Sequence, residues 1–581
     1  MSVQDADAKI VRLEPRPNLP HGALRDASRP LELWAGLECS HVTIDGAIRD
    51  QLHETGHLIR DDDLDRIADL GIRTIRYPLL WAHAEGGGPT LADHGRRLAR
   101  LEALGITPIA GFLHHGAGPD GLLPTDPGFA ERLADFAETV VRRFPSLRHF
   151  TPINEPVTTA RIACLYGQWE PHARDTPTFL RHVAGYATAT AEVMRRIRDL
   201  RPAAMLIQTE DVGRVFATEA LAEQAAYENE RRFLGFDLLC GRVGQGHPFW
   251  TELVDAGVAV DTLAALAAAP CPPDIMGIDQ YLTSDRFLDH RLERYPHEPV
   301  GGNGRQAYVD VAAVRVPELQ PQVGLLARLR EVKARYGLPI AVTEVHNGCT
   351  REEQLRWLME AWQAATAARQ DGIDVRAITV WSLFGTYDWN SMLRERRGFY
   401  ESGAFDVRHD PPHPTVIAKA AASLARHGRF DHPLLARAGW WRDCASDPVA
   451  LLRVEGPIKV LDPVLACCAR RRIDTLAPGG GATRPEVPEW GALTLSVEGE
   501  VCRFSFHSTG ATDALQIDAD IDADMIAATD AVLDLAVDGL TGHFTLTELG
   551  PHCQYRLLPV DLSQADEIGP RRKERYARGG G

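Results

Sequence analysis

The chain has 581 residues, and 63 Lys or Arg against 80 Asp or Glu give a formal net charge of -17 at pH 7. This acidic balance argues against nucleic acid or an anionic membrane as a partner. No segment approaches the roughly 18 apolar residues of a membrane-spanning helix, and we expect no signal peptide in the polar first residues. The ten cysteines include no C-x-x-C pair, so we expect reduced thiols and a cytoplasmic protein, with homo-oligomerisation left open.

Short apolar runs alternate with amphipathic helical stretches from Leu31 to about residue 425. Several helical stretches end at a Gly or Pro that turns the chain into the next apolar run. The alternation predicts an α/β fold, a (β/α)8 TIM barrel, rather than an open doubly wound sheet, because no glycine-rich crossover follows the first run. The eight expected strands are Leu33–Glu38, Ile72–Trp81, Ile106–His114, Phe150–Glu155, Ala204–Glu210, Ile275–Tyr281, Ile340–Glu344 and Ile378–Phe384.

The composition changes after the predicted barrel. Prolines and a run of glycines interrupt the next segment, which we therefore expect to have little regular structure. Apolar residues then alternate with polar ones, as at Leu493 and Leu495 and again at Leu533, Leu535 and Val537, which predicts a small, antiparallel, β-rich unit. The predicted organisation is a disordered leader (1–29), a catalytic barrel (30–428), a connector (429–487), a small β-rich domain (488–562) and a tail (563–581).

Two of the predicted strands end in a glutamate, Glu155 in one and Glu344 in the other. An acid at the C-terminal end of a buried parallel strand lies where barrel enzymes bind their ligands. A salt-bridged strand end remains the alternative for either residue alone, but two acids facing one sugar ring are what glycoside hydrolysis requires. We therefore expect Glu155 to be the general acid/base, held protonated by burial near the nucleophile Glu344.

Other polar and aromatic residues at the strand ends fit a sugar site. Arg76 can neutralise and orient Glu344, and Tyr281 can donate a hydrogen bond to it. Asn154 can hydrogen-bond the sugar 2-OH, a contact that strengthens in the transition state. A packing or surface role stays open for each residue taken alone. The remaining expected substrate-binding residues are Trp381, as the floor of the sugar site, and His114, Asp388 and Trp389.

These segments resemble the motifs of glycoside hydrolase family 1. Thr151–Pro156 is similar to its T-x-N-E-P motif, and Pro339–Glu344 is similar to its nucleophile strand, L-P-I-x-I-T-E. The resemblance covers about residues 31–408 and implies a retaining β-glycosidase that acts on a small glycoside or oligosaccharide without a metal or cofactor. Three further segments carry it: Arg76–Trp81 (R-F-S-x-x-W), Asp279–Tyr281 (N-x-Y), and Trp381–Leu383 with Asp388–Trp389 (W-S-L-x-D-N-x-E-W).

The chain departs from the family pattern at several sugar contacts. Asp388 replaces a sugar-binding glutamate, and His115 stands where a tryptophan is usual. The nearest candidates for the family's first-strand glutamine are Glu38 and His41, and the loop Val345–Gly348 after the nucleophile is longer. The sugar is therefore left open. A second hypothesis also stays open, namely a carbohydrate-binding barrel that does not hydrolyse its ligand and whose C-terminal unit has an interaction role.

Two local patterns point to metals. His53-Glu54-Thr55-Gly56-His57 matches H-E-x-x-H, so a zinc metalloprotease is a remote alternative, although Gly56 weakens a helix there and no third ligand follows at a recognisable spacing. Four alternating aspartates between Asp518 and Asp524 resemble a calcium site, but they lack the glycine and terminal glutamate of an EF-hand loop. We interpret them as the solvated edge of a strand.

Overall fold

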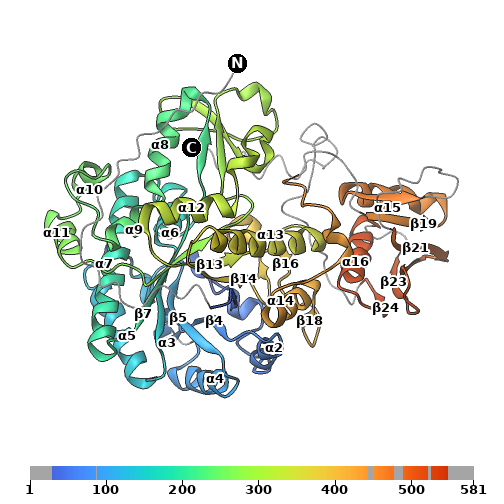
Figure 1. The fold of residues 1–581 in the computed structure, drawn as a ribbon, viewed down its shortest axis with the longest axis horizontal. Helices are drawn as coiled ribbons and strands as arrows, with labels where there is room; N and C mark the ends of the chain where they lie inside the picture. The colour runs from blue at the N-terminus through green and yellow to red at the C-terminus, as the bar shows by residue number, and fades with distance from the viewer. Residues whose placement is uncertain (1–28, 87, 443–449, 477–488, 521–524, 547–581) are drawn as a thin grey trace.

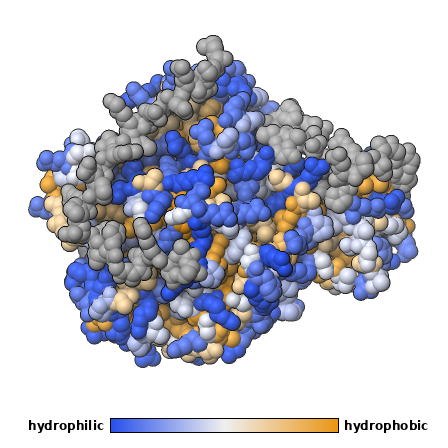
Figure 2. Space-filling model, in the orientation of Figure 1, coloured by the Kyte–Doolittle hydropathy of each residue, from blue (hydrophilic) through white to orange (hydrophobic). Residues whose placement is uncertain are grey.

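The computed structural model describes residues 29–86, 88–442, 450–476, 489–520 and 525–546. The expected leader, apart from its last residue, and the expected tail lie outside these ranges. Within them, none of the helices combines the length and apolar character needed to cross a membrane. Hydrophilic residues dominate the described surface in Figure 2, and apolar residues occur there in small separate groups.

Eight parallel strands close into a barrel in the order β1-β14-β13-β9-β7-β6-β5-β4 (Figure 1). β1 pairs with β4 on one side and β14 on the other, which closes the sheet. Each expected strand has its counterpart, so the prediction of a (β/α)8 barrel is confirmed. The strands are β1 (Glu32–Gly36), β4 (Thr74–Pro78), β5 (Thr107–His114), β6 (His149–Asn154), β7 (Met205–Asp211), β9 (Ile275–Asp279), β13 (Ile340–Val345) and β14 (Val375–Val380).

Long helices cover the outside of the barrel, and their sequences explain where they begin. Thr90 and Asp93 form a capping box at the start of α4, satisfying backbone N–H groups that the first turn leaves free. Gly337 and Gly428 end α12 and α14 in the left-handed conformation that glycine adopts at low cost. The helices are α2 (Asp63–Asp69), α4 (Leu91–Ala103), α5 (Phe129–Arg143), α7 (Thr176–Leu200), α8 (Ala222–Arg231), α12 (Leu325–Tyr336), α13 (Arg351–Gln370) and α14 (Val416–His427).

The barrel interior has a small core of its own. Buried residues from six different strands form a cluster separate from the large core beneath the helices: Trp34, Ile109, Ile207, Ile275, Ala341 and Ala377. A barrel interior filled by side chains is a packed core rather than a pore. The space for a ligand is therefore at the barrel mouth, beyond this core.

Additional elements enlarge the loops that follow the C-terminal ends of the strands, where barrel enzymes place their sites. The helices in these loops are α1 (Gln51–Glu54), α3 (Trp81–Gly86) and α6 (Pro156–Ala160), whereas α9 (Leu234–Leu239), α10 (Trp250–Asp255) and α11 (Val260–Ala268) follow α8 and lead to β9. The strands are β2 (His41–Ile44), β3 (Ala47–Asp50), β8 (Val215–Ala217), β10 (Arg286–Asp289), β11 (Val300–Gly302), β12 (Ala307–Ala312), β15 (Thr386–Tyr387), β16 (Tyr400–Glu401), β17 (Phe405–Asp406) and β18 (His413–Pro414).

A second sheet, of order β20-β19-β21-β22-β23-β24, lies beside the barrel next to α13 and α14 (Figure 1). Its middle strands β21, β22 and β23 are antiparallel, as predicted, whereas β19, β20 and β21 are parallel to one another, as are β23 and β24. The elements are β19 (Ala450–Glu455), α15 (Ile458–Arg470), β20 (Ile473–Leu476), β21 (Glu489–Glu498), β22 (Val501–Ser508), β23 (Leu515–Asp520), α16 (Met525–Val537) and β24 (Gly542–Thr545).

The prediction of an irregular connector over 429–487 is wrong, because β19, α15 and β20 lie within it. The prolines that suggested irregular structure fit the helix: Pro457 precedes its first turn and Pro463 lies inside it. Val464 and Cys468, one turn apart, are both buried on the helix face that packs into the sheet domain. Burial of this apolar face outweighs the hydrogen bond that a proline removes from the helix interior.

Two details of the predicted β-rich domain are also wrong. Leu533 and Val537 belong to α16, not to a strand. Nearly every residue of that helix is buried, Asp530 and Asp534 included, so its sequence has no exposed polar face to mark a helical period. Asp518 does not lie on a sheet edge, since β23 runs between β22 and β24, and it pairs with Arg503 and His543. Asp522 and Asp524, the last two aspartates of the calcium hypothesis, lie outside the described residues.

Buried charges join the C-terminal sheet domain to the barrel. The fully buried Arg471 side chain donates to Glu352 of α13 at 2.6 Å and to Asp534 of α16 at 2.9 Å. Arg351, the residue before Glu352 in α13, lies 3.2 Å from Asp538, which follows α16. Asp538 also accepts the backbone N–H that begins α14. Ion pairs buried between two domains fix how the domains pack, because leaving either partner unpaired is costly.

Replacing Arg471 with leucine should therefore lower the free energy of unfolding by about 3–5 kcal/mol, since it leaves the buried carboxylates of Glu352 and Asp534 without their shared cation. Denaturant unfolding of the full chain measures this loss. Arg195→Leu is the matched control, because Arg195 pairs with Glu192 and Asp199 on an exposed helix face and should unfold like the wild type. Equal stability of the two variants would contradict the buried-charge account.

Candidate active site

The end of β6 places a carboxyl group in the mouth of the barrel. Asn154 closes the strand, and Glu155 follows in a left-handed backbone conformation with φ of 42°, immediately before Pro156 begins α6. The buried Glu210 of β7 holds this turn by accepting hydrogen bonds from the backbone N–H and the hydroxyl of Thr158. A non-glycine residue in this conformation is costly unless its surroundings fix it, and such residues concentrate at functional sites.

Glu344, near the end of β13, is the second buried carboxyl group, and both of its oxygens accept hydrogen bonds. Arg76 Nη1 donates to Oε1 at 2.7 Å, and the Tyr281 hydroxyl donates to Oε2. Burial raises the pKa of Glu344, but the Arg76 charge and the two hydrogen bonds oppose that rise. The pKa of Glu155 lies well above its ordinary value because of burial and then the charge of Glu344. The environment thus makes Glu344 the stronger acid of the two.

Arg76 connects four barrel strands. From the middle of β4 it donates to the Thr343 carbonyl at 2.9 Å and to the Asn154 side-chain oxygen. Its guanidinium also lies 4.7 Å from the centre of the Trp381 ring, which follows β14. Because Arg76 and Thr209 both donate to the Asn154 oxygen, the Asn154 amide nitrogen is directed toward His114, 3.4 Å away.

Histidines and tryptophans form a wall around the two glutamates. The His114 ring stacks on Trp381 with centroids 5.6 Å apart, and His115 Nε2 lies 3.8 Å from a Glu155 oxygen. Burial and the nearby Arg76 lower the pKa of His115 to about 3 and hold that of His114 well below its ordinary value, so both rings are neutral. Trp389 packs edge-on against His115.

Seven of the predicted site residues thus lie together at the barrel mouth. Six are joined by direct contacts, namely Glu344, Arg76, Asn154, Tyr281, His114 and Trp381, and Glu155 lies within 4.8 Å of Glu344. Arg76, His114, Asn154 and Trp381 also line a cavity. Trp389 adjoins this group through His115. Asp388 is the exception.

The Asp388 carboxylate is turned toward its own loop. It pairs with Arg49 at 3.0 Å and accepts backbone N–H groups from Arg397 and Phe399, so its oxygens hold together the loop that follows β15. The sequence offered no signal for this role, because Arg49 lies 339 positions earlier in the chain.

Glu38, rather than His41, lies beside the sugar-site residues. Its Oε1 accepts from the Ser40 N–H and hydroxyl and is 3.8 Å from His114 Nε2. Burial and the charge of Glu344 raise the pKa of Glu38 to about 7. Of the two candidates for the family's first-strand glutamine, the one beside the site is therefore an ionisable group.

A third carboxyl group near the two glutamates was missed by the sequence analysis. One oxygen from each of Glu155, Asp279 and Glu344 lies within 4.8 Å of the others. Asp279 ends β9 and accepts from the Thr343 hydroxyl at 2.6 Å. A strand-end acid was the signal that identified the other two residues, and the same signal applied here. The Arg76 guanidinium on Glu344 makes this group unsuited to a metal cation, because like charges repel.

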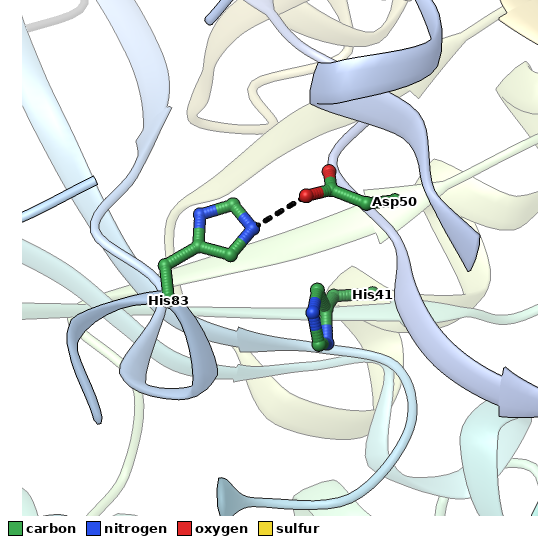
Figure 3. Close-up of side chains that lie close together, drawn as sticks. All are labelled: His41, Asp50 and His83. Carbon is green, nitrogen blue, oxygen red and sulfur yellow. Dashed lines mark hydrogen bonds and ion pairs between the residues drawn. The ribbon is translucent and has the colours of Figure 1, made fainter. Parts of the chain in front are cut away.

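His41, Asp50 and His83 form another compact group near the barrel mouth (Figure 3). Asp50 Oδ2 is 2.8 Å from His83 Nε2, and Asp50 Oδ1 accepts the Leu52 and His53 N–H groups that begin α1. The other His83 nitrogen is buried, has no hydrogen-bond partner in the described part of the chain and points away from the group. Zinc-bound imidazoles usually donate that second N–H to an acceptor. The group fits a brace between β3 and α3 better than a zinc site.

The H-E-x-x-H segment does not form a zinc site. Helix α1 ends at Glu54, and Gly56 follows with φ of 75°, so the two histidines do not share a helix face. The first histidine is exposed, whereas His57 is buried with Nδ1 2.9 Å from Asp63 and Nε2 3.0 Å from Arg97 Nη1. Both nitrogens that could bind a metal are already paired.

Comparison with known proteins agrees with this geometry. The sequence model of Glycosyl hydrolase family 1 matches residues 44–404. The chain belongs to this family. It is therefore a glycoside hydrolase, and the earlier resemblance is confirmed. The match ends before the C-terminal sheet domain, which lies outside the family region.

Individual relatives of this family 1 protein are distant. Aryl-phospho-beta-D-glucosidase BglC of Bacillus subtilis is 22% identical over 386 residues, covering 58% of this chain and 79% of that protein. Beta-glucosidase A of Thermotoga maritima is 21% identical over 371 residues, with the same two coverages. A solved structure of the Thermotoga maritima beta-glucosidase, in complex with castanospermine, superposes with a TM-score of 0.54 at 16% identity, covering 69% of this chain and 98% of that one. Such a likeness shows the shared fold.

The geometry at Asp388 makes a prediction that separates its two roles. Asp388→Ala should lower the free energy of unfolding by about 1.5–3 kcal/mol, because it removes charge-assisted hydrogen bonds that hold the loop. Urea unfolding measures the change. Glu395→Ala in the same loop removes only a partly exposed pair with Arg397 and should leave stability unchanged. Wild-type stability of Asp388→Ala combined with a raised KM would instead assign Asp388 to the substrate.

Proposed function

We propose that this family 1 protein is a retaining β-glycosidase that hydrolyses the O-glycosidic bond of a small glycoside or oligosaccharide by double displacement. The observation that carries the proposal is the approach of a Glu155 oxygen to within 4.8 Å of a Glu344 oxygen. Carboxyl groups lie about 5–5.5 Å apart in retaining glycosidases and about 6.5–9.5 Å apart in inverting ones, which must fit a water between them. The short separation supports direct attack by a carboxylate.

Glu344 is the proposed nucleophile. Arg76 and Tyr281 hold it ionised and fix both oxygens, so that it attacks the anomeric carbon while the bond to the leaving oxygen breaks. Glu155 gives its proton to that leaving oxygen. In the second step Glu155 accepts a proton from water, the resulting hydroxide oxygen bonds to the anomeric carbon, and Glu344 is released as a carboxylate.

The surrounding residues support binding of a sugar ring. The Asn154 oxygen is already occupied by Arg76 and Thr209, which leaves its amide N–H groups to meet a hydroxyl such as the 2-OH. Trp381 offers an aromatic face for the apolar side of the ring, and neutral His114 can donate or accept a hydrogen bond. This complete set favours hydrolysis over binding alone.

A cytoplasmic location is part of the same proposal. Six cysteines in the described ranges carry free thiols, namely Cys39, Cys164, Cys240, Cys271, Cys467 and Cys468; five of these are buried, and Cys240 is only partly buried. Unpaired thiols in such number are typical of a reducing compartment.

The test of the nucleophile is Glu344→Ala assayed on nitrophenyl β-glycosides (glucoside, galactoside, fucoside, mannoside and xyloside) with and without azide. We expect turnover to fall by at least about 10³-fold, as losses of a catalytic nucleophile do. Azide should restore it with formation of an α-glycosyl azide, because the anion fills the space left by the carboxylate. Glu155→Ala with azide should give the β-glycosyl azide instead. A well-folded wild type that turns over no glycoside would overturn the proposal.

Tyr281→Phe should move the acidic limb of the kcat/KM profile to higher pH. The enzyme needs Glu344 ionised, so activity is lost as pH falls through its pKa, and the Tyr281 hydroxyl lowers that pKa. A hydrogen bond to a charged group is worth about 1.5–3 kcal/mol, which corresponds to a rise of about 1–2 pH units. Tyr227→Phe, which loses a bond to the distant Glu252, is the control and should keep the wild-type limb.

A further inference from the structure

Asp279 is a buried acid in the active site to which the proposed mechanism gives no task. Its side chain has no exposure, one oxygen accepts from Thr343, and the other makes no hydrogen bond within the described part of the chain. One of its oxygens lies within 4.8 Å of both Glu155 and Glu344. A buried carboxyl group with one unpartnered oxygen, close to two other acids, is costly unless a proton is present.

The cation nearest this cluster is already used. Arg76 Nη1 is bonded to Glu344 and Nη2 to Asn154, so neither group is left for Asp279 or Glu155. The other groups facing Glu155 and Asp279 are the neutral His115, the Tyr281 phenol and the acids Glu210 and Asp211 of β7, which share the charge of Arg161. Burial and the charge of Glu344 hold the pKa of Asp279, like that of Glu155, well above its ordinary value.

We propose that Asp279 is a positioning residue for acid–base catalysis that shares one proton with Glu155, so that Glu155 stays protonated to higher pH than Glu344 alone would allow. The two carboxyl groups then titrate as a pair, because Arg76 is bonded to Glu344 and its charge only partly offsets the repulsion between the two close acids. The inference rests on the proposed role of Glu155. The N-x-Y pattern of the family has an asparagine at this position, which cannot titrate, so the effect belongs to this chain.

Asp279 matters most in the second step. Once Glu344 is esterified to the sugar it carries no charge and no longer raises the pKa of Glu155. The charge of Asp279 remains, and it keeps Glu155 basic enough to accept the proton from water. Thr343, adjacent to the nucleophile, holds Asp279 in place through the 2.6 Å hydrogen bond.

Asp279→Asn tests the inference, because it keeps the shape and removes the titrating group. The alkaline limb of kcat/KM, which reports loss of the Glu155 proton, should move at least about 1 unit toward lower pH, since like charges at this distance interact by more than 1.4 kcal/mol. Glu353→Gln is the matched control. It removes another buried carboxyl group, but Glu353 pairs with Arg356 on its own helix and is not among the acids that act on Glu155, so the alkaline limb should stay. An unchanged limb in Asp279→Asn would overturn the inference.

A second readout does not depend on turnover. Infrared difference spectra record the carbonyl band of protonated carboxyl groups as the pH is raised, and the Glu38→Gln background removes the contribution of Glu38. The last such band should disappear at a lower pH in the Asp279→Asn double variant than in Glu38→Gln alone. If the two titrations coincide while both proteins are folded, Asp279 does not share a proton. Absence of glycosidase activity alone would contradict the proposed function but leave this readout intact.

Discussion

The Arg76 guanidinium is buried among carboxyl groups, and a buried cation must be paired or it destabilises the fold. Its two terminal nitrogens reach Glu344, the Thr343 carbonyl and Asn154, while its face lies over Trp381. These contacts join the middle of β4 to the ends of β6, β13 and β14. The arginine therefore fixes the shape of the site and also determines which acid carries the negative charge.

The pairing of Arg76 with Glu344 explains why the two glutamates differ in pKa. Glu344 receives the guanidinium and a phenol, whereas Glu155 receives no donor of comparable strength and has neutral His115 beside it. Pairs of titratable groups whose surroundings separate their pKa values are the usual basis of acid–base assignment. The histidines contribute by staying neutral, because a charged imidazole near Glu155 would remove the difference.

The barrel and most of its site could be predicted from the sequence because both leave local signals. Strands that are buried on both faces appear as short apolar runs, and an acid such as Glu155 at the end of one is conspicuous. The role of Asp388 in holding its loop could not be predicted in this way, because its partner Arg49 is distant in the chain. Asp279 carried the same local signal as Glu155 but lay inside a motif whose family form has an asparagine. In α15 and α16, burial by neighbouring elements overrode the local patterns of proline and alternation.

The C-terminal sheet domain contacts the barrel at the end of the loop that follows the proposed nucleophile strand. The longer loop after Glu344 ends at Arg351, the first residue of α13. Arg351 is fixed by Asp406 and Ser402 of the barrel and by Asp538, which follows α16. Fixing the ends of a loop restricts its motion. One end of this loop is fixed by an ion pair between the barrel and the C-terminal sheet domain. The domain outside the family region is thus part of the structural support of the strand that carries the proposed nucleophile.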